Sequence, residues 1–140
     1  MKNSGLCDEN INLLPQGHSL TEDLAGKAVR LHYGSGHVLE QHWQTESQML
    51  WKGIEGALQG HQQIEKYYAV KITEGIYLIT WLEAGTVATT EGEDIQGPWL
   101  TDVVLDFNRM LATASWMGPT NDNRIEYVLD QAEMEYIDCQ

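Results

Sequence analysis

The most informative run of the sequence places a carboxylate in register with aromatic side chains. In residues 76–83, one alternating face carries Tyr77, Ile79, Trp81 and Glu83, because successive side chains of a strand point to opposite faces. A carboxyl group buried beside such rings has a raised pKa and can act as a proton donor. If this face lines an interior, Glu83 lies at its mouth or inside it. The run therefore indicates general-acid chemistry or a ligand contact at Glu83.

A predicted hairpin supplies a second group of candidate residues. The loop 34–36 reads Gly-Ser-Gly, and its glycines can adopt the positive φ that short hairpin loops need. A three-residue loop pairs Tyr33 with His37 and Leu31 with Leu39. Because cross-strand neighbours share a face, all four side chains are predicted to lie together.

Two further runs place polar groups among aliphatic ones. Lys52 shares a face with Leu50 and Ile54, and Tyr68 shares a face with Val70 and Ile72. An apolar interior with a few convergent polar groups is typical of a small-molecule pocket. The predicted ligand-binding residues are Tyr33, His37, Lys52, Tyr68, Tyr77, Trp81 and Glu83.

Each of these residues also has a purely structural interpretation. Tyrosine and tryptophan in strands are common core residues with a satisfied polar tip. His37 lies beside a turn, where exposure is common, and Lys52 can extend its charged end to the rim. Glu83 can end its strand in water. These residues recur on one face of consecutive strands, and this recurrence favours a site.

Metal and nucleotide chemistry lack their usual patterns. His32, His37 and His42 are spaced by an odd number of residues, so neighbours in this series point to opposite faces of a strand. Glu40 and His42 share a face, which gives two ligands and no third. The sequence contains no Gly-x-Ser-x-Gly elbow, phosphate-binding glycine loop or Cys-x-x-Cys pair. We expect no metal and no cofactor.

The elements that position these residues are predicted to be strands. Short runs rich in Val, Ile, Thr, Tyr and Trp, punctuated by glycine, are typical of a β-barrel or sandwich. Sequential hairpins favour an up-and-down antiparallel barrel of eight or nine strands, which leaves no exposed edge. The predicted strands lie near 27–33, 37–44, 48–54, 63–73, 76–83, 86–91, 99–107, 109–116 and 131–137. Short helical segments are predicted at 21–24 and 123–130, with 1–23 as a flexible arm and 24–140 as one domain.

Composition limits the classes of partner. The chain has 140 residues, 42% of them hydrophobic, which suits one globular domain. Eight Lys and Arg residues against 21 Asp and Glu give a net charge of −13, which disfavours nucleic acid and anionic membranes. Residues 1–14 show no secretory signal, and Cys7 and Cys139 are predicted to be free thiols. The expected location is cytoplasmic.

The sequence also carries a family resemblance. The run 74–83, preceded by Gly26 and the hairpin 33–40, resembles the small calycin-type, lipocalin-like β-barrels. Two relatives are the bacterial phenolic acid decarboxylases and the MoaF-like proteins (molybdenum cofactor biosynthesis protein F). The tract 101–107, followed by a further strand, is closer to the MoaF-like pattern. Because relatives of this fold pair through barrel faces, the resemblance also implies a homodimer.

The decarboxylase resemblance implies roles for individual residues. Those enzymes hold a hydroxycinnamate with a tyrosine pair, an arginine and a glutamate. The glutamate matches Glu83 and the second tyrosine matches Tyr33, whereas Lys52 stands at the arginine position and Leu31 at the first tyrosine position. Lysine keeps the charge without the bidentate fork, and leucine cannot hydrogen-bond a carboxylate.

Three functions are therefore weighed. The first is a MoaF-like barrel that binds a small, partly aromatic molecule. The second is a cofactor-free carboxy-lyase of the phenolic acid decarboxylase type, in which Glu83 is the proton donor and Tyr33 and Lys52 address the two ends of the substrate. The third is an interaction protein whose barrel is filled by its own side chains, since five tryptophans can close a small barrel.

Overall fold

The protein is an all-β half-barrel. The computed structural model describes residues 8–83, 87–88, 94–95 and 97–138, and within them ten antiparallel strands form one sheet and two more form a separate pair. The strands are β1 (Ser19–Leu20), β2 (Ala28–Tyr33), β3 (Val38–Trp43), β4 (Gln48–Glu55), β5 (Gln62–Lys66), β6 (Tyr68–Thr73), β7 (Ile76–Glu83), β8 (Val87–Ala88), β9 (Asp94–Ile95), β10 (Trp99–Asp106), β11 (Leu111–Pro119) and β12 (Ile125–Tyr136).

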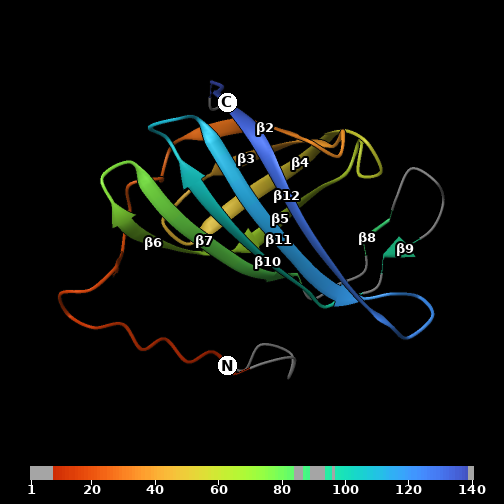
Figure 1. The fold of residues 1–140 in the computed structure, drawn as a ribbon, viewed down its shortest axis with the longest axis horizontal. Helices are drawn as coiled ribbons and strands as arrows, with labels where there is room; N and C mark the ends of the chain where they lie inside the picture. Colours follow the sequence, from red (N-terminus) through yellow and green to blue (C-terminus); the bar gives the residue numbers. More distant parts are fainter. Residues whose placement is uncertain (1–7, 84–86, 89–93, 96, 139–140) are drawn as a thin grey trace.

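One long strand, β12, joins the two halves of the curled sheet. The strand order of the sheet is β1-β6-β7-β10-β11-β12-β2-β3-β4-β5, so β12 pairs with β11 on one side and with β2 on the other. Figure 1 shows β12 running diagonally across this junction. The last strand, β5, returns to contact β7. The predicted all-β antiparallel architecture is thus confirmed, but the sheet is a half-barrel of ten strands, with β1 and β5 at its ends, rather than a closed barrel of eight or nine.

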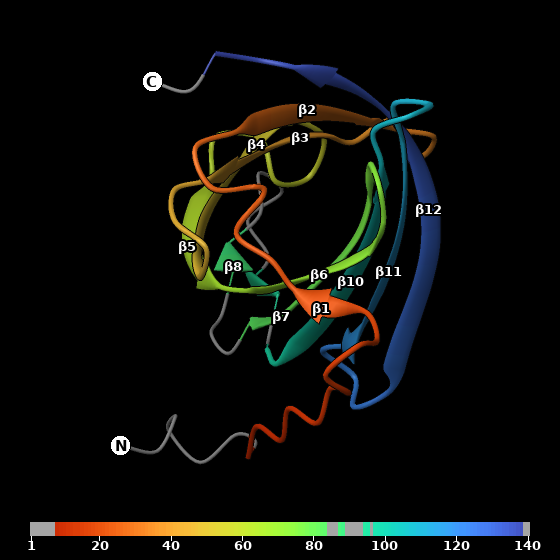
Figure 2. The same cartoon turned by 90° about the vertical axis from the view of Figure 1, so that its left-hand side faces the viewer.

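One end of the curled sheet is packed with hydrophobic side chains. The segment between β1 and β2 crosses this end (Figure 2) and buries Leu24 there. Phe107 lies edge-on to Trp43 and Tyr77 and stacks on Tyr136. We call this the capped end. The opposite end, where β7 finishes at Glu83 and near which β8 and β9 lie in Figure 1, is called the mouth end.

The two predicted helical segments are wrong, because neither is helical in the structure. Residues 21–24 form single turns, with hydrogen bonds from the Ala25 N–H to Glu22 and from the Lys27 N–H to Leu24. Gly26, at φ 86°, then redirects the chain into β2. Residues 125–130 belong to β12, whose register with β11 is continuous over its whole first half. Tertiary pairing there overrides local helical preference.

Other boundaries differ in smaller ways. The run 63–73 was predicted as one strand but divides into β5 and β6, because the chain bends at the buried Tyr67. The final strand starts at Ile125 rather than near residue 131. Of the predicted strand 86–91, only 87–88 lie within the described residues, and they form β8. Cys7 and Cys139 lie outside the described residues.

The N-terminal segment is tied to the outside of the barrel by polar contacts. The Glu9 carboxylate accepts hydrogen bonds from Lys66 at 3.0 Å and from the Tyr68 hydroxyl. At the capped end, Asp23 accepts a hydrogen bond from the Tyr77 hydroxyl at 2.8 Å and pairs with Lys71.

In the described part of the chain, no helix is long and apolar enough to cross a membrane.

Candidate functional site

The inward face of β7, β10 and β11 forms one wall of a candidate site. Thr101 stands between Trp81 on β7 and Trp116 on β11 in the strand register, so the three side chains form a row. Glu83, two residues beyond Trp81, accepts a hydrogen bond from the Trp81 indole N–H at 2.9 Å. The Tyr33 ring reaches Trp116 from β2, with 5.2 Å between ring centroids.

The inward face of β3, β4 and β5 forms the facing wall. Gln41, Trp51 and Gln63 occupy adjacent positions across these strands. The Trp51 indole N–H donates a hydrogen bond to the Glu65 carboxylate at 3.0 Å. Both Trp51 and Glu65 are buried. Each wall therefore presents a tryptophan whose indole N–H bonds to a carboxyl group, which is buried in Glu65 and partly buried in Glu83.

The two carboxyl groups meet where β5 returns to β7. β5 packs against β7, and Glu83 lies near enough to Glu65 for its charge to act on that carboxyl group. Burial raises the pKa of Glu65 to about 7, and the charge of Glu83 adds to this rise against the Trp51 hydrogen bond. Burial also raises the pKa of Glu83, although Trp81 and Thr101 oppose it. The pair can therefore bind or release a proton near neutral pH.

Several buried polar atoms near these carboxyl groups have no hydrogen-bond partner. They include Oε1 of Gln41, Oε1 of Gln63 and the Thr101 hydroxyl, which lies near Glu83 without normal hydrogen-bond geometry. Gln41 and Thr101 are 2% and 1% exposed. Buried polar groups in proteins are nearly always hydrogen-bonded, so each exception requires an explanation. We call the set Gln41, Trp51, Gln63, Glu65, Trp81, Glu83 and Thr101 the interior polar cluster.

Comparison with known families identifies the fold. The model of the MoaF C-terminal domain matches residues 18–136, which is most of the chain. This chain belongs to the MoaF C-terminal domain family. The predicted MoaF-like resemblance is confirmed, and the interior polar cluster lies entirely within the matched residues.

A solved structure with a similar fold supports the same architecture. The crystal structure of a "putative beta-lactamase" from Burkholderia vietnamiensis superposes with a TM-score of 0.60 and 14% sequence identity, covering 81% of this chain and 95% of that one. At this identity the likeness concerns the fold alone. No curated protein sequence matches this MoaF C-terminal domain.

Three of the sequence-predicted site residues meet in the MoaF C-terminal domain. Tyr33, Trp81 and Glu83 all face the interior at the walls described above. Tyr77 also faces inward, but it bonds to Asp23 at the capped end, six residues and roughly 20 Å along β7 from Glu83.

The other three predicted residues lie elsewhere, contrary to the expected interior placement. Lys52 is on the outer face of β4, where its cross-strand neighbour is the outward Glu40. Tyr68 is on the outer face of β6 and bonds to Glu9. His37 lies at the rim, where its ring covers Gly56 and its Nδ1 is 3.0 Å from the Ser35 hydroxyl.

The hairpin pairings were correct, and they contained a signal for residues that the sequence argument missed. Leu31 pairs with Leu39, and the Tyr33 N–H bonds to the His37 carbonyl. Alternation along β3 from Leu39 then places Gln41 inward. The β3–β4 register is unbroken from Leu39 to Trp43 and pairs Gln41 with Trp51, which places Trp51 inward as well. That register depends on the loop between Trp43 and Gln48, whose conformation spacing alone does not reveal.

This MoaF C-terminal domain also has a groove on its outside. This groove of about 270 Å³ lies outside the interior polar cluster, between the start of the barrel and the loop after β3. Its lining residues are Leu20, Thr21, Glu22, Glu46, Ser47, Tyr67, Tyr68 and Ala69. Among the residues placed by the structure, no group of three or more His, Cys, Asp or Glu side chains could hold a metal ion.

Proposed function

We propose that this MoaF C-terminal domain binds a small, partly aromatic molecule in its barrel interior, between the two tryptophan-bearing walls. The observation that carries the proposal is the set of buried polar atoms without partners, Oε1 of Gln41 and Oε1 of Gln63 above all. A barrel filled only by its own side chains would leave these atoms with an unmet desolvation cost. A bound molecule can supply the missing hydrogen bonds.

Several side chains of the candidate site keep a small exposed surface. Core side chains such as Val29, Leu31 and Ile79 are fully buried. Tyr33, Trp51, Trp81 and Glu65, by contrast, keep between 4% and 8% of their surface exposed. A pocket lined by aromatic rings with a few convergent polar groups is the usual form of a small-molecule site.

A thermal-shift screen tests this proposal. Purified protein would be heated with hydroxycinnamates, related aromatic acids, aromatic amines and neutral phenols, and Glu83→Gln would be run alongside. A ligand that binds only the folded state stabilises it by about 2.7 kcal/mol at a hundredfold excess over Kd. A shift that Glu83→Gln reduces or alters supports the proposal. No shift with any compound favours the filled barrel and a protein partner.

The carboxy-lyase remains a second candidate because of one observation, the raised pKa of the buried Glu83. A proton donor at neutral pH needs this property. The placement of Lys52 on the outer face removes the residue that was expected to hold a substrate carboxylate. Incubation with p-coumarate tests this candidate directly. Formation of vinylphenol that Glu83→Gln abolishes would establish it, and its absence would exclude this substrate.

The cytoplasmic location and the homodimer stay predictions from the sequence and the family resemblance. Fractionation of cells that express the tagged chain tests the location. Light scattering during gel filtration tests the oligomeric state.

A further inference from the structure

Hydrogen-bond acceptors dominate the unoccupied polar atoms of the interior polar cluster. The carboxylates of Glu65 and Glu83 accept hydrogen bonds only, once ionised, and the free atoms of Gln41 and Gln63 are carbonyl oxygens. The nearby indole N–H groups of Trp51 and Trp81 are already used, because each donates to one of the carboxylates. A ligand that complements this arrangement must bring N–H or O–H donors.

The positive charges of the described chain lie away from this cluster. Lys66 bonds to Glu9, and Lys71 pairs with Asp23 and Glu74 near the capped end. Arg30 bonds to Glu40 on the outer face, where Lys52 also lies. Lys27, Arg109 and Arg124 lie in or beside turns. An anionic ligand would therefore face two carboxyl groups without a described cation to balance it.

The walls also offer aromatic surface beside the carboxyl groups. Trp51 and Trp81 each contact the carboxyl group that they hold, and Trp116 lies against Tyr33. Indole faces attract cations, and tryptophan does so most strongly among the aromatic side chains. Aromatic rings also bury the apolar part of a ligand.

We propose that the interior polar cluster binds a primary organic ammonium, that is, a protonated amine attached to an aromatic body. The ammonium group lies between Glu65 and Glu83 and donates its hydrogens to these carboxylates and to the Gln41 or Gln63 carbonyl. The aromatic body packs against Trp51, Trp81 and Trp116. This inference rests on the proposed function, since it names the ligand class of the same site.

The electrostatics of the pair lead to a pH signature. Two like charges in a buried site repel each other, so an ammonium between them relieves both repulsion and desolvation. Glu65 has a pKa of about 7, and Glu83 is the charged group that acts on it. Amine binding therefore strengthens as the pH rises from 6 to 8, where Glu65 ionises while the amine stays protonated. An anionic ligand would show the opposite trend.

Calorimetric titration with three matched compounds tests the proposal. The compounds are 2-phenylethylamine, 2-phenylethanol and phenylacetate, which share the ring and differ in the charge of the polar end. We expect the amine to bind about tenfold or more tightly than the alcohol at pH 8, with phenylacetate weakest. The amine is expected to lose most of this advantage at pH 6.

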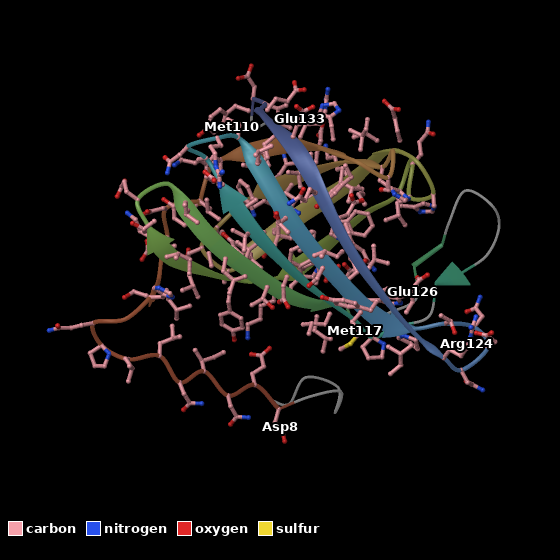
Figure 3. All side chains as sticks on the ribbon, viewed as in Figure 1. Asp8, Met110, Met117, Arg124, Glu126 and Glu133 are labelled. Carbon is pink, nitrogen blue, oxygen red and sulfur yellow. The ribbon has the colours of Figure 1, made fainter. Side chains whose placement is uncertain are left out.

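Isosteric variants locate the effect. Glu65→Gln and Glu83→Gln should each weaken amine binding about tenfold and leave the affinity for the alcohol unchanged. Unchanged affinity for the alcohol also shows that the variant is folded. Glu133→Gln is the matched control, because this substitution changes the net charge by the same amount as the other two. Glu133 is exposed on β12, at the opposite end of the strand from Glu126 (Figure 3).

The outcomes separate the two levels of the proposal. If phenylacetate or the alcohol binds in the barrel and the amine does not, the ammonium inference is overturned and the binding function stands. If Glu133→Gln weakens the amine as much as Glu65→Gln does, the attraction is general and the inference is overturned as well. If none of the three compounds binds and the wider screen also shows no shift, the proposed function itself fails.

Discussion

The indole N–H of Trp51 donates a hydrogen bond to the Glu65 carboxylate over 3.0 Å inside the barrel. This bond stabilises the charged form of Glu65, but burial and the nearby Glu83 act against it more strongly. The carboxyl group therefore titrates near pH 7, where a small change in its surroundings alters its charge. The stability of the fold and the proposed binding of an amine are therefore expected to depend on this one group.

Stability should fall as the pH rises from about 4.5 to about 7 and change little above that, once Glu65 is ionised in both states. The unfolded chain releases the Glu65 proton near its ordinary pKa of 4.5, whereas the folded protein keeps it up to about pH 7. Between these values the unfolded state loses protons that the folded state retains, so unfolding becomes easier by roughly 3 kcal/mol. Glu65→Gln should remove most of this decline and make the protein more stable than the wild type at pH 8. Urea unfolding at pH 5 and pH 8 measures both.

The control for this experiment is Glu133→Gln on the outer face of β12. It removes the same formal charge from a chain whose net charge is −13, so it reports the general repulsion alone. Equal pH dependence in Glu65→Gln and the wild type would show that Glu65 ionises as an ordinary carboxylate.

Removal of the Trp51 hydrogen bond should raise the pKa of Glu65 further. Trp51→Phe keeps an aromatic ring in the wall and loses the N–H that favours the ionised carboxylate. Carbon NMR of the labelled Glu65 carboxyl group follows its titration directly. Trp116→Phe is the comparison, because Trp116 packs on Tyr33 and should leave the Glu65 titration unchanged. A lowered Glu65 pKa in Trp51→Phe would contradict this account.

Much of the fold was predictable from local pattern. Alternation and glycine turns located most of the strands, and β7 matches its predicted bounds at 76–83. The hairpin around Gly34 to Gly36 also paired as expected, because a short loop leaves little freedom of register. These features depend on residues that are close in the sequence, so local patterns are enough to predict them.

The composition of the site was less predictable because both faces of several strands are partly apolar. In β4, Leu50 and Ile54 made the Lys52 face look interior, while the buried face carries Met49 and Trp51. Hydrophobic alternation cannot choose between two such faces. The choice depends on how β4 pairs with β3, and the loop between Trp43 and Gln48 sets that register, which is unbroken from Leu39 to Trp43.

Glu65 illustrates a second limit. On β5 and β6 the inward residues include Glu65, Tyr67 and Ala69, whereas the outward ones include Ile64, 59% of which is exposed. A carboxylate inside and an isoleucine outside reverse the usual pattern. Departures from the usual hydrophobic pattern are expected at functional sites, because residues there are selected for function as well as for folding.

A separate carboxylate on the outer face should control acid stability. Glu40 is 7% exposed, and it accepts hydrogen bonds from His42 at 2.9 Å and from the Arg30 guanidinium. Burial alone would raise the pKa of Glu40, but these two bonds outweigh it and hold the pKa below its usual value. The stability that Glu40 contributes is therefore present above its ordinary pKa and lost as the pH falls through the lowered value.

Glu40→Gln should destabilise the protein by about 1–3 kcal/mol at pH 7, because Arg30 and His42 then lose a charged acceptor. The difference from the wild type should shrink at low pH, where Glu40 itself becomes protonated. Denaturant unfolding at pH 7 and pH 3 measures both values. A variant as stable as the wild type at pH 7 would show that the hydrogen bonds of Glu40 contribute no more to stability than the hydrogen bonds that the same groups make with water.

A glycine next to the site should resist substitution for steric rather than conformational reasons. Gly53 follows Trp51 on the inward face of β4, and a Cβ added there would overlap the backbone carbonyl of Leu58. The same stretch is fixed by hydrogen bonds from the Gly53 N–H to His61 at 2.8 Å and from the Gly60 N–H to Gly53 at 3.0 Å. The loop after β4 cannot retreat without breaking these bonds.

Gly53→Ala should therefore cost about 3 kcal/mol or more in the free energy of unfolding. Gly36→Ala is the contrasting variant, because Gly36 has φ 99° with open space around it and should lose only about 1–2 kcal/mol to backbone strain. Thermal and urea unfolding of both variants give the comparison. If Gly36→Ala lowers the free energy of unfolding more than Gly53→Ala does, the loop after β4 can move to accommodate a Cβ at residue 53, and the steric explanation is wrong. If Gly53→Ala is the more destabilising, the steric explanation stands. Weak binding of the amine by the folded fraction of this variant would further indicate that the loop positions Trp51, which bonds to Glu65.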